Sequence, residues 1–195
     1  MFSALFSALK KPVIYIQISP ERLTLKNLKT GKTIAEVPEL AISKSPRPTI
    51  LAFGSEARRA AASQPADILN PFTHPRSLAS DFQVAELLLK YQVRRILGNP
   101  ALLVDHLLQS PAIRAIVRLL AIAPHIVIHP LGSPEGGFTQ VERRAFRDMA
   151  LQAGASEVLL CEFGRPLTDQ EVLSAIANPD QPPKSGMWNA WNANN

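Results

Sequence analysis

The carboxylate with the clearest chemical context in this sequence is Glu142, which stands three residues after Thr139 at the predicted start of a helix. A hydroxyl residue followed three places later by glutamate forms a capping box, in which each side chain accepts the backbone N–H of the other residue. The same carboxylate could orient a hydrolytic water, but that role requires a phosphate beside it. From these residues alone, Glu142 is interpreted as a helix cap.

A glycine-rich segment, "GSPEGGF" at residues 132–138, precedes the same helix. Glycines before a helix N-terminus can bind an anion through their backbone N–H groups. This segment has neither the lysine nor the spacing of a P-loop, and Glu135 would repel a phosphate. It is therefore interpreted as a loop insertion.

No metal site is predicted from the histidines or the cysteine. His125 and His129 are four residues apart on a predicted strand, which separates them by about 13 Å, too far to share a metal. His74 and His106 have no evident partners. Cys161 lies within an apolar strand and is interpreted as a small buried hydrophobic residue.

The elements that must position these residues are those of an α/β fold. Alternating apolar residues predict strands at 13–19, 22–28 and 33–37, which form an antiparallel meander. A strand at 126–128, a helix at 140–153 and a strand at 157–161 predict a parallel crossover, expected to be right-handed.

Other elements are predicted around this framework. The proline-broken residues 44–77 contain a short strand near "TILAF" and a helical turn at "SEARRAAA". Ser80 is expected to cap a helix whose buried stripe is Val84, Leu87, Leu88 and Tyr91, extended by Val93 or Ile96. Short helices are expected in the 99–123 region and a last helix at 168–177.

The string "TQVERRAFRDMALQAGASEVLLCE" closely resembles a segment of MreB, the bacterial actin-like rod shape-determining protein. "VPELAIS", "ILAFGSEARRA" and "LASDFQVAELLL" are weaker similarities to that family in the expected order, so the resemblance covers roughly residues 12 to 165. It implies an incomplete actin/Hsp70-like (ribonuclease H-like) domain, with a mixed sheet that combines the antiparallel N-terminal meander and the parallel strand–helix–strand unit.

Two departures from the family affect nucleotide binding. The resemblance implies an aspartate for the metal and a glycine for close phosphate approach in the turn after the first strand, but this turn carries Gln17, Ser19 and Pro20. An amide cannot replace a carboxylate facing a divalent cation, and proline removes an N–H donor. The second phosphate loop, the adenosine pocket and the second domain of the family would follow residue 161, whereas this chain ends at residue 195.

These departures predict a truncated domain that needs no cofactor. ATP and magnesium are expected not to bind, enzymatic activity is not expected, and Glu142 is a vestigial candidate for the family's water-orienting glutamate.

The N-terminal residues predict a contact with a membrane surface. Apolar residues recur at helical spacing and are followed by two lysines: Phe2, Leu5, Phe6, Leu9, Lys10 and Lys11. An apolar stripe beside cations is typical of a weak interfacial helix, and members of the resembled family use a similar segment in this way. The alternative is a helix packed on its own domain. Residues 1–60 hold ten Lys and Arg against four Asp and Glu, so the positive charge is concentrated near this segment.

Composition places the chain among cytoplasmic globular proteins. Its 195 residues are 46% apolar and 19% charged, and a single cysteine favours a reducing compartment. The predicted organisation is an amphipathic segment at 1–11, one actin-like domain at 12–178 and a disordered tail at 179–195. Trp188 and Trp191 in that tail are either a docking motif or part of a functionless extension.

The leading functional prediction is an MreB-like cell-shape protein of the cytoskeleton, unable to bind or hydrolyse ATP. Its partner would be a protein, such as a full-length actin-like filament, near the inner face of the membrane, where the chain would bind peripherally. One alternative is a residual ATPase completed by a second chain, which would need ATP and magnesium. Another is a small basic nucleic-acid-binding domain, for which no recognition pattern is present. A decayed gene product is a further alternative.

Overall fold

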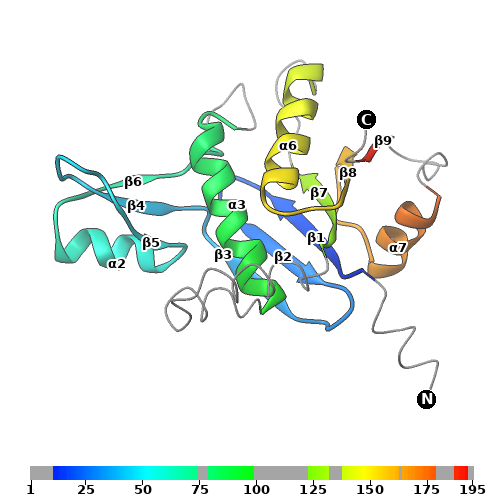
Figure 1. Cartoon of the computed structure of the whole chain (residues 1–195), viewed down its shortest axis with the longest axis horizontal. Coiled ribbons are helices and arrows are strands. Elements are labelled where there is room, and N and C mark those ends of the chain that lie inside the picture. Colours follow the sequence, from blue (N-terminus) through cyan, green and yellow to red (C-terminus); the bar gives the residue numbers. More distant parts are fainter. Residues whose placement is uncertain are drawn as a thin grey trace, which may run out of the picture.

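The computed structural model describes residues 11–73, 79–98, 123–131, 138–162, 164–178 and 187–192. The elements in chain order are β1 (Val13–Ile18), β2 (Leu23–Asn27), β3 (Thr33–Glu36), β4 (Leu40–Ser43), β5 (Ile50–Phe53), α2 (Glu56–Ser63), β6 (Ala66–Leu69), α3 (Phe82–Leu97), β7 (His125–Pro130), α6 (Gln140–Gln152), β8 (Glu157–Glu162), α7 (Asp169–Ala177) and β9 (Met187–Asn192). They form a main sheet with helices against it and a small lobe to one side (Figure 1).

The main sheet has the strand order β3-β2-β1-β7-β8-β9. β1 pairs antiparallel with β2, and β2 pairs antiparallel with β3, which confirms the predicted meander. β1, β7 and β8 run parallel to one another, and α6 connects the last two, so the predicted strand–helix–strand unit is also confirmed. The mixed α/β fold class is therefore as predicted.

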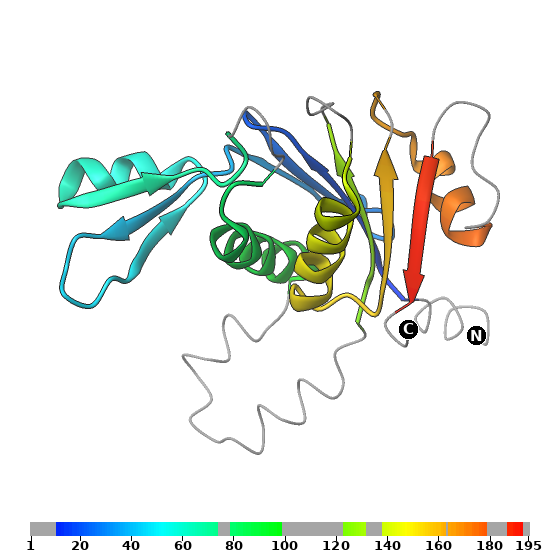
Figure 2. The same ribbon diagram turned by 90° about the horizontal axis from the view of Figure 1, so that it is seen from above.

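Helices cover both faces of the main sheet (Figure 2). α3 and α6 lie side by side on one face, where the β1 residues Ile14, Ile16 and Ile18 belong to their hydrophobic cluster. α7 lies on the opposite face, over a second cluster that comprises Tyr15, Val127, Leu159, Cys161, Leu167, Val172 and Ala175. Because β-strand side chains alternate between faces, Gln17 lies on the same face as Tyr15.

The small lobe consists of the sheet β5-β4-β6 and helix α2 (Figures 1 and 2). The predicted strand near "TILAF" and the helical turn that follows it are confirmed as β5 and α2. β4 and β6 were not predicted, because each has only four residues and lies beside proline-rich sequence, where alternation is too short to recognise. The lobe is joined to the main core by stacking of Phe53 on Tyr91, with ring centroids 4.0 Å apart.

Helix α3 differs from its prediction in its cap and its buried face. Asp81, not Ser80, is the N-cap, and its side chain accepts the N–H of Val84. The hydroxyl of Ser80 instead donates to the carbonyl of Pro71. Leu87 is 42% exposed, whereas Leu89 is fully buried, because α3 packs against the sheet on one side and α6 on the other.

The prediction of a tail without fold is wrong for part of residues 179–195. Met187–Asn192 forms β9, which pairs antiparallel with β8 along its whole length. Without β9, β8 would be the edge strand of the sheet and would leave backbone N–H and C=O groups unpaired. β9 pairs with these groups through its own backbone, so its asparagine-rich composition does not prevent strand formation. Short helices were predicted within 99–123, and residues 99–122 of that range lie outside the described residues, as do residues 1–10.

Candidate functional site

The carboxyl ends of β1 and β7 mark the point where the strand order of the main sheet reverses. The chain leaves β1 toward β2 and β3 on one side, whereas β8 follows β7 on the other. Ligands of open α/β sheets bind at such a switch point. Gln17, Ser19 and Pro20 lie at the end of β1, and α6 begins after the end of β7, so the structure places Glu142 at the same edge of the sheet.

The turn between β1 and β2 uses most of its own backbone donors. The Ser19 N–H donates to the Arg22 carbonyl at 2.9 Å, and the Arg22 N–H donates to the Ser19 hydroxyl oxygen at 3.0 Å. Pro20 has no N–H. Among these four turn residues, only the N–H of Glu21 is left for a ligand.

A side chain from outside the turn also holds it in place. Asn70, which follows β6, donates from Nδ2 to the Pro20 carbonyl at 2.8 Å and accepts the Phe72 N–H on Oδ1 at 3.0 Å. The Leu131 N–H donates to the Ile18 carbonyl at 2.7 Å, which joins the ends of β1 and β7. The turn is thus fixed by the segments on both sides of it. Sequence reasoning missed Asn70, which is 50 residues from its partner and carries no local signal.

A buried polar network lies beside Gln17 and was not foreseen from the sequence. The Tyr15 hydroxyl is 2.6 Å from Nδ1 of His129 and accepts the Leu167 N–H at 2.9 Å. Burial raises the pKa of Tyr15, while the Leu167 N–H and the Gln17 side chain act in the opposite direction. His129 is the parallel partner of Gln17 in β7. Gln17, which stands where the sequence resemblance implies an aspartate, therefore adjoins a network that anchors the start of α7.

Glu142 forms the predicted capping box. Its Oε2 accepts the Thr139 N–H and the Thr139 hydroxyl, both at 2.9 Å, and its own N–H donates to the Thr139 hydroxyl oxygen at 3.2 Å. The residue is only 8% exposed. The interpretation of Glu142 as a helix cap is confirmed.

Arg143, the residue of α6 that follows Glu142, makes an ion pair with Glu162 at the same edge of the main sheet. Arg143 donates to both carboxylate oxygens of Glu162 at the end of β8, at 2.7 and 2.9 Å. Hydrogen bonding to Glu162 raises the pKa of Arg143, and the Glu162 side chain is 9% exposed. Such a bidentate pair fixes α6 relative to β8 and uses two of the N–H donors of Arg143.

The described residues contain no group of three or more His, Cys, Asp or Glu that could hold a metal ion. His125 pairs with Glu157 at 3.1 Å, while His74 and His106 lie outside the described residues. Cys161 is fully buried, and burial raises the pKa of its thiol to about 12, so the interpretation of Cys161 as a buried hydrophobic residue is confirmed. The glycine-rich residues 132–137 also lie outside the described residues.

Of the residues predicted to contact a membrane, Lys11 alone falls among those that the structure describes. Its ammonium is 3.4 Å from a carboxylate oxygen of Glu157. Phe2, Leu5, Phe6, Leu9 and Lys10 precede it and lie outside the described residues. None of the described helices has the length and apolar character needed to cross a membrane.

Comparisons with known proteins establish the fold. No protein-family model matches the chain, and no curated protein matches it in sequence. Among solved structures, it is similar to MreB5 of Spiroplasma citri bound to AMPPNP, with a TM-score of 0.53 and 16% identity. The ADP-bound form of MreB5 gives a TM-score of 0.51, again with 16% identity.

Each of these matches covers 77% of this chain but 38% of the MreB5 chain. The likeness therefore extends over most of this chain and over less than half of the relative. At 16% identity, the structural similarity establishes the fold alone. The resemblance found in the sequence is thus confirmed in three dimensions, and the chain has an MreB-like actin fold.

Proposed function

We propose that this chain is an MreB-like cytoskeletal protein that acts through contacts with other proteins near a membrane and does not bind nucleotide. The fold and the sequence string at 139–162 support the relationship to MreB. The β1–β2 turn supports the loss of nucleotide binding. A scaffold that neither binds nor hydrolyses ATP can still present the surfaces of an actin-like domain.

The observation that carries the proposal is the hydrogen bonding of the β1–β2 turn. A phosphate-binding turn offers several backbone N–H groups to its ligand. Here the N–H groups of Ser19 and Arg22 bond within the turn, Pro20 has none, and Asn70 holds the Pro20 carbonyl. Gln17 adds a neutral amide where a magnesium ion would need a carboxylate oxygen. The turn is therefore a β-hairpin connection in which the N–H of Glu21 alone, among Ser19 to Arg22, is left for a ligand.

Equilibrium unfolding in the presence and absence of Mg-ATP tests the loss of binding. A ligand at about one hundred times its Kd stabilises the native state by about 2.7 kcal/mol. Such a gain would raise the Tm of a domain of this size by roughly 5–10 °C. We expect no shift with Mg-ATP at about 1 mM. A shift of several degrees with Mg-ATP, absent with AMP and magnesium, would refute the proposal.

Cosedimentation tests the proposed protein contact. The chain is mixed with filaments of the full-length actin-like protein from the same cell, and the pellet is compared with the chain alone. We expect the chain to pellet only with filaments, with no ATP hydrolysis beyond that of the filaments. Additional hydrolysis that is lost in Glu142→Ala would instead favour an ATPase completed by the second chain.

A further inference from the structure

Strand β9 forms one edge of the main sheet. It pairs with β8 through six consecutive residue pairs, from Glu157 with Asn192 to Glu162 with Met187. Figure 2 shows β9, in red, at the border of the sheet. Among the strands that the structure describes, β8 alone pairs with β9. With respect to those strands, the outward N–H and C=O groups of β9 are left for a further strand.

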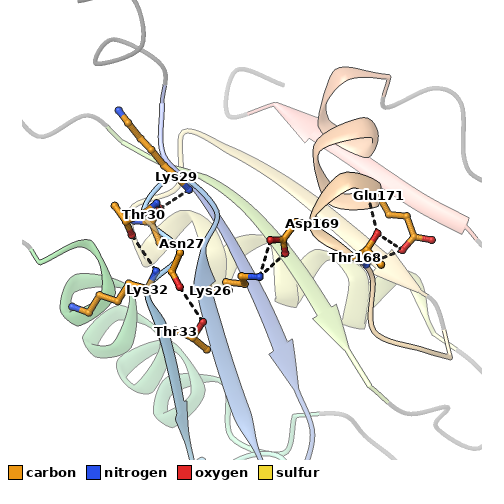
Figure 3. Close-up of polar contacts among 10 residues, drawn as sticks. Lys26, Asn27, Lys29, Thr30, Lys32, Thr33, Thr168, Asp169 and Glu171 are labelled. Atoms are coloured by element: carbon orange, nitrogen blue, oxygen red, sulfur yellow. Dashed lines mark hydrogen bonds and ion pairs between the residues drawn. The ribbon is translucent and has the colours of Figure 1, made fainter. Parts of the chain in front are cut away.

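The other three edge strands of the two sheets carry features that discourage further pairing. β3 has four residues, follows Lys32 and ends at Glu36, and Figure 3 shows Lys32 in the turn that leads into it. β5 also has four residues, lies just after Pro48 and pairs with β4 through a register shift. β6 is equally short and contains Asp67. Short length, charge, proline and bulges are the means by which sheets avoid edge-to-edge association.

Strand β9 has none of these features. Its sequence is "MWNAWN", and the whole of residues 185–195 contains neither a charged residue nor a proline. A six-residue strand without charge, proline or glycine pairs readily with an identical strand, and asparagine and aromatic residues add to such pairing. β9 is therefore the edge, among those of the described strands, that is suited to a further strand.

We propose that β9 pairs antiparallel with β9 of a second copy of this chain, so that two six-stranded main sheets form one continuous sheet. A two-fold axis relates the copies, and identical residues meet around it. A charged residue near such an axis would face its own charge, and residues 185–195 have no charge to repel. The same neutrality gives an acidic or a basic partner strand nothing to recognise.

This inference goes beyond the proposed function, because pairing of two copies needs neither nucleotide nor a filament. One strand pair buries less than the roughly 1,200 Å² at which stable interfaces begin. We therefore expect a reversible dimer with a Kd on the order of 10–100 µM. Sedimentation velocity of the full chain, over concentrations on both sides of that range, should show the mass rising from 21.3 kDa toward twice that value.

Two substitutions of Asn189 test whether β9 is the contact. Asn189 lies in the middle of β9, as the partner of Leu160 in β8. In a two-fold pairing centred on Asn189 or on Ala190, the two copies of Asn189 are directly opposite or diagonal neighbours. Asn189→Lys and Asn189→Glu therefore each place like charges beside the axis. An equal mixture of the two variants places opposite charges there.

We expect each variant alone to dimerise at least roughly tenfold more weakly than the wild type, since like charges facing each other across an interface are strongly unfavourable. The equal mixture should recover dimers that contain one copy of each variant. The matched control is Ala35→Lys, which adds the same charge to an exposed residue of β3 at the opposite edge of the main sheet. It should change the Kd by less than about twofold, because β3 lies outside the proposed contact.

Tryptophan emission shows whether β9 keeps its place in the variants. Trp188 and Trp191 are the two tryptophans of the chain, and both lie in β9, so their emission reports on this strand. At concentrations far below the Kd, the emission spectrum and the urea midpoint of each variant should match those of the wild type.

Four results would overturn the inference. The first is a wild type that stays monomeric throughout the concentration range. The second is Asn189→Lys dimerising as well as the wild type, which would place the contact elsewhere. The third is a mixture of the Lys and Glu variants that stays monomeric although the tryptophan emission is unchanged. The fourth is a monomeric wild type whose cosedimentation with filaments is lost in Asn189→Lys. In that last case β9 binds a strand of the partner protein, and the proposed function stands.

Discussion

Replacing Tyr15 by phenylalanine tests how the face under α7 is held together. The change removes one hydroxyl that accepts the Leu167 N–H and bonds to Nδ1 of His129, and it leaves the ring in place. Tyr15 is 4% exposed and His129 is fully buried, so water does not readily replace the lost partner. Each buried polar group left without its partner costs about 1–3 kcal/mol, so the two groups predict a loss of about 3 kcal/mol in unfolding free energy.

Urea unfolding followed by circular dichroism measures this loss. The midpoint should fall while the slope with urea concentration stays unchanged, because the same surface is exposed on unfolding. The matched control is Tyr91→Phe. The Tyr91 ring stacks on Phe53, and no hydrogen bond of its hydroxyl is found in the described part of the chain. A loss below about 0.5 kcal/mol for Tyr15→Phe, or an equal loss for the control, would refute the reasoning.

Three further predictions concern the thiol, the start of α7 and the start of α6. Because burial raises the pKa of the Cys161 thiol to about 12, a thiol reagent at mildly alkaline pH should label it only after unfolding in urea, and rapid labelling of the native chain would contradict this. Hydrogen bonds from Arg165, and then from the Thr168 N–H and hydroxyl, lower the pKa of Glu171 from 4.5 to about 2. The ionised Glu171 therefore contributes stability above pH 4.5, and this contribution is lost as the pH falls toward 2. Glu171→Gln should flatten the decline of the urea midpoint across that window, and parallel curves would count against it. Thr139→Ala breaks the capping box of α6 and should cost about 1 kcal/mol in urea unfolding, whereas an unchanged midpoint would show that the cap is dispensable.

Local patterns in the sequence predicted the central sheet and its crossover helix. β1 to β3 follow from alternating apolar residues between turn residues, and α6 follows from its capping box and its helical periodicity. The missed strands β4, β6 and β9 are short or have compositions untypical of strands. These strands form because neighbouring strands provide backbone hydrogen-bond partners, and those partners are brought together only when the chain folds.

Part of the candidate site could likewise be predicted from the sequence, and part of it could not. Gln17, Ser19 and Pro20 are close neighbours along the chain, so the altered turn can be recognised from the sequence alone. The bond between Tyr15 and His129 spans 114 residues, and the bond between Tyr15 and Leu167 spans 152. Such contacts depend on the register of β1 against β7 and on the side of the sheet that α7 covers. Neither the register nor the covered side can be recognised from local patterns in a single sequence.

Isothermal titration of Mg-ATP into the 195-residue chain is the most direct test of the central claim, that the self-bonded β1–β2 turn leaves no phosphate site. The account predicts heats equal to those of dilution up to nucleotide concentrations of about 1 mM, so that any Kd lies well above that value. A saturable isotherm with a micromolar Kd, abolished by chelating the magnesium, would contradict it.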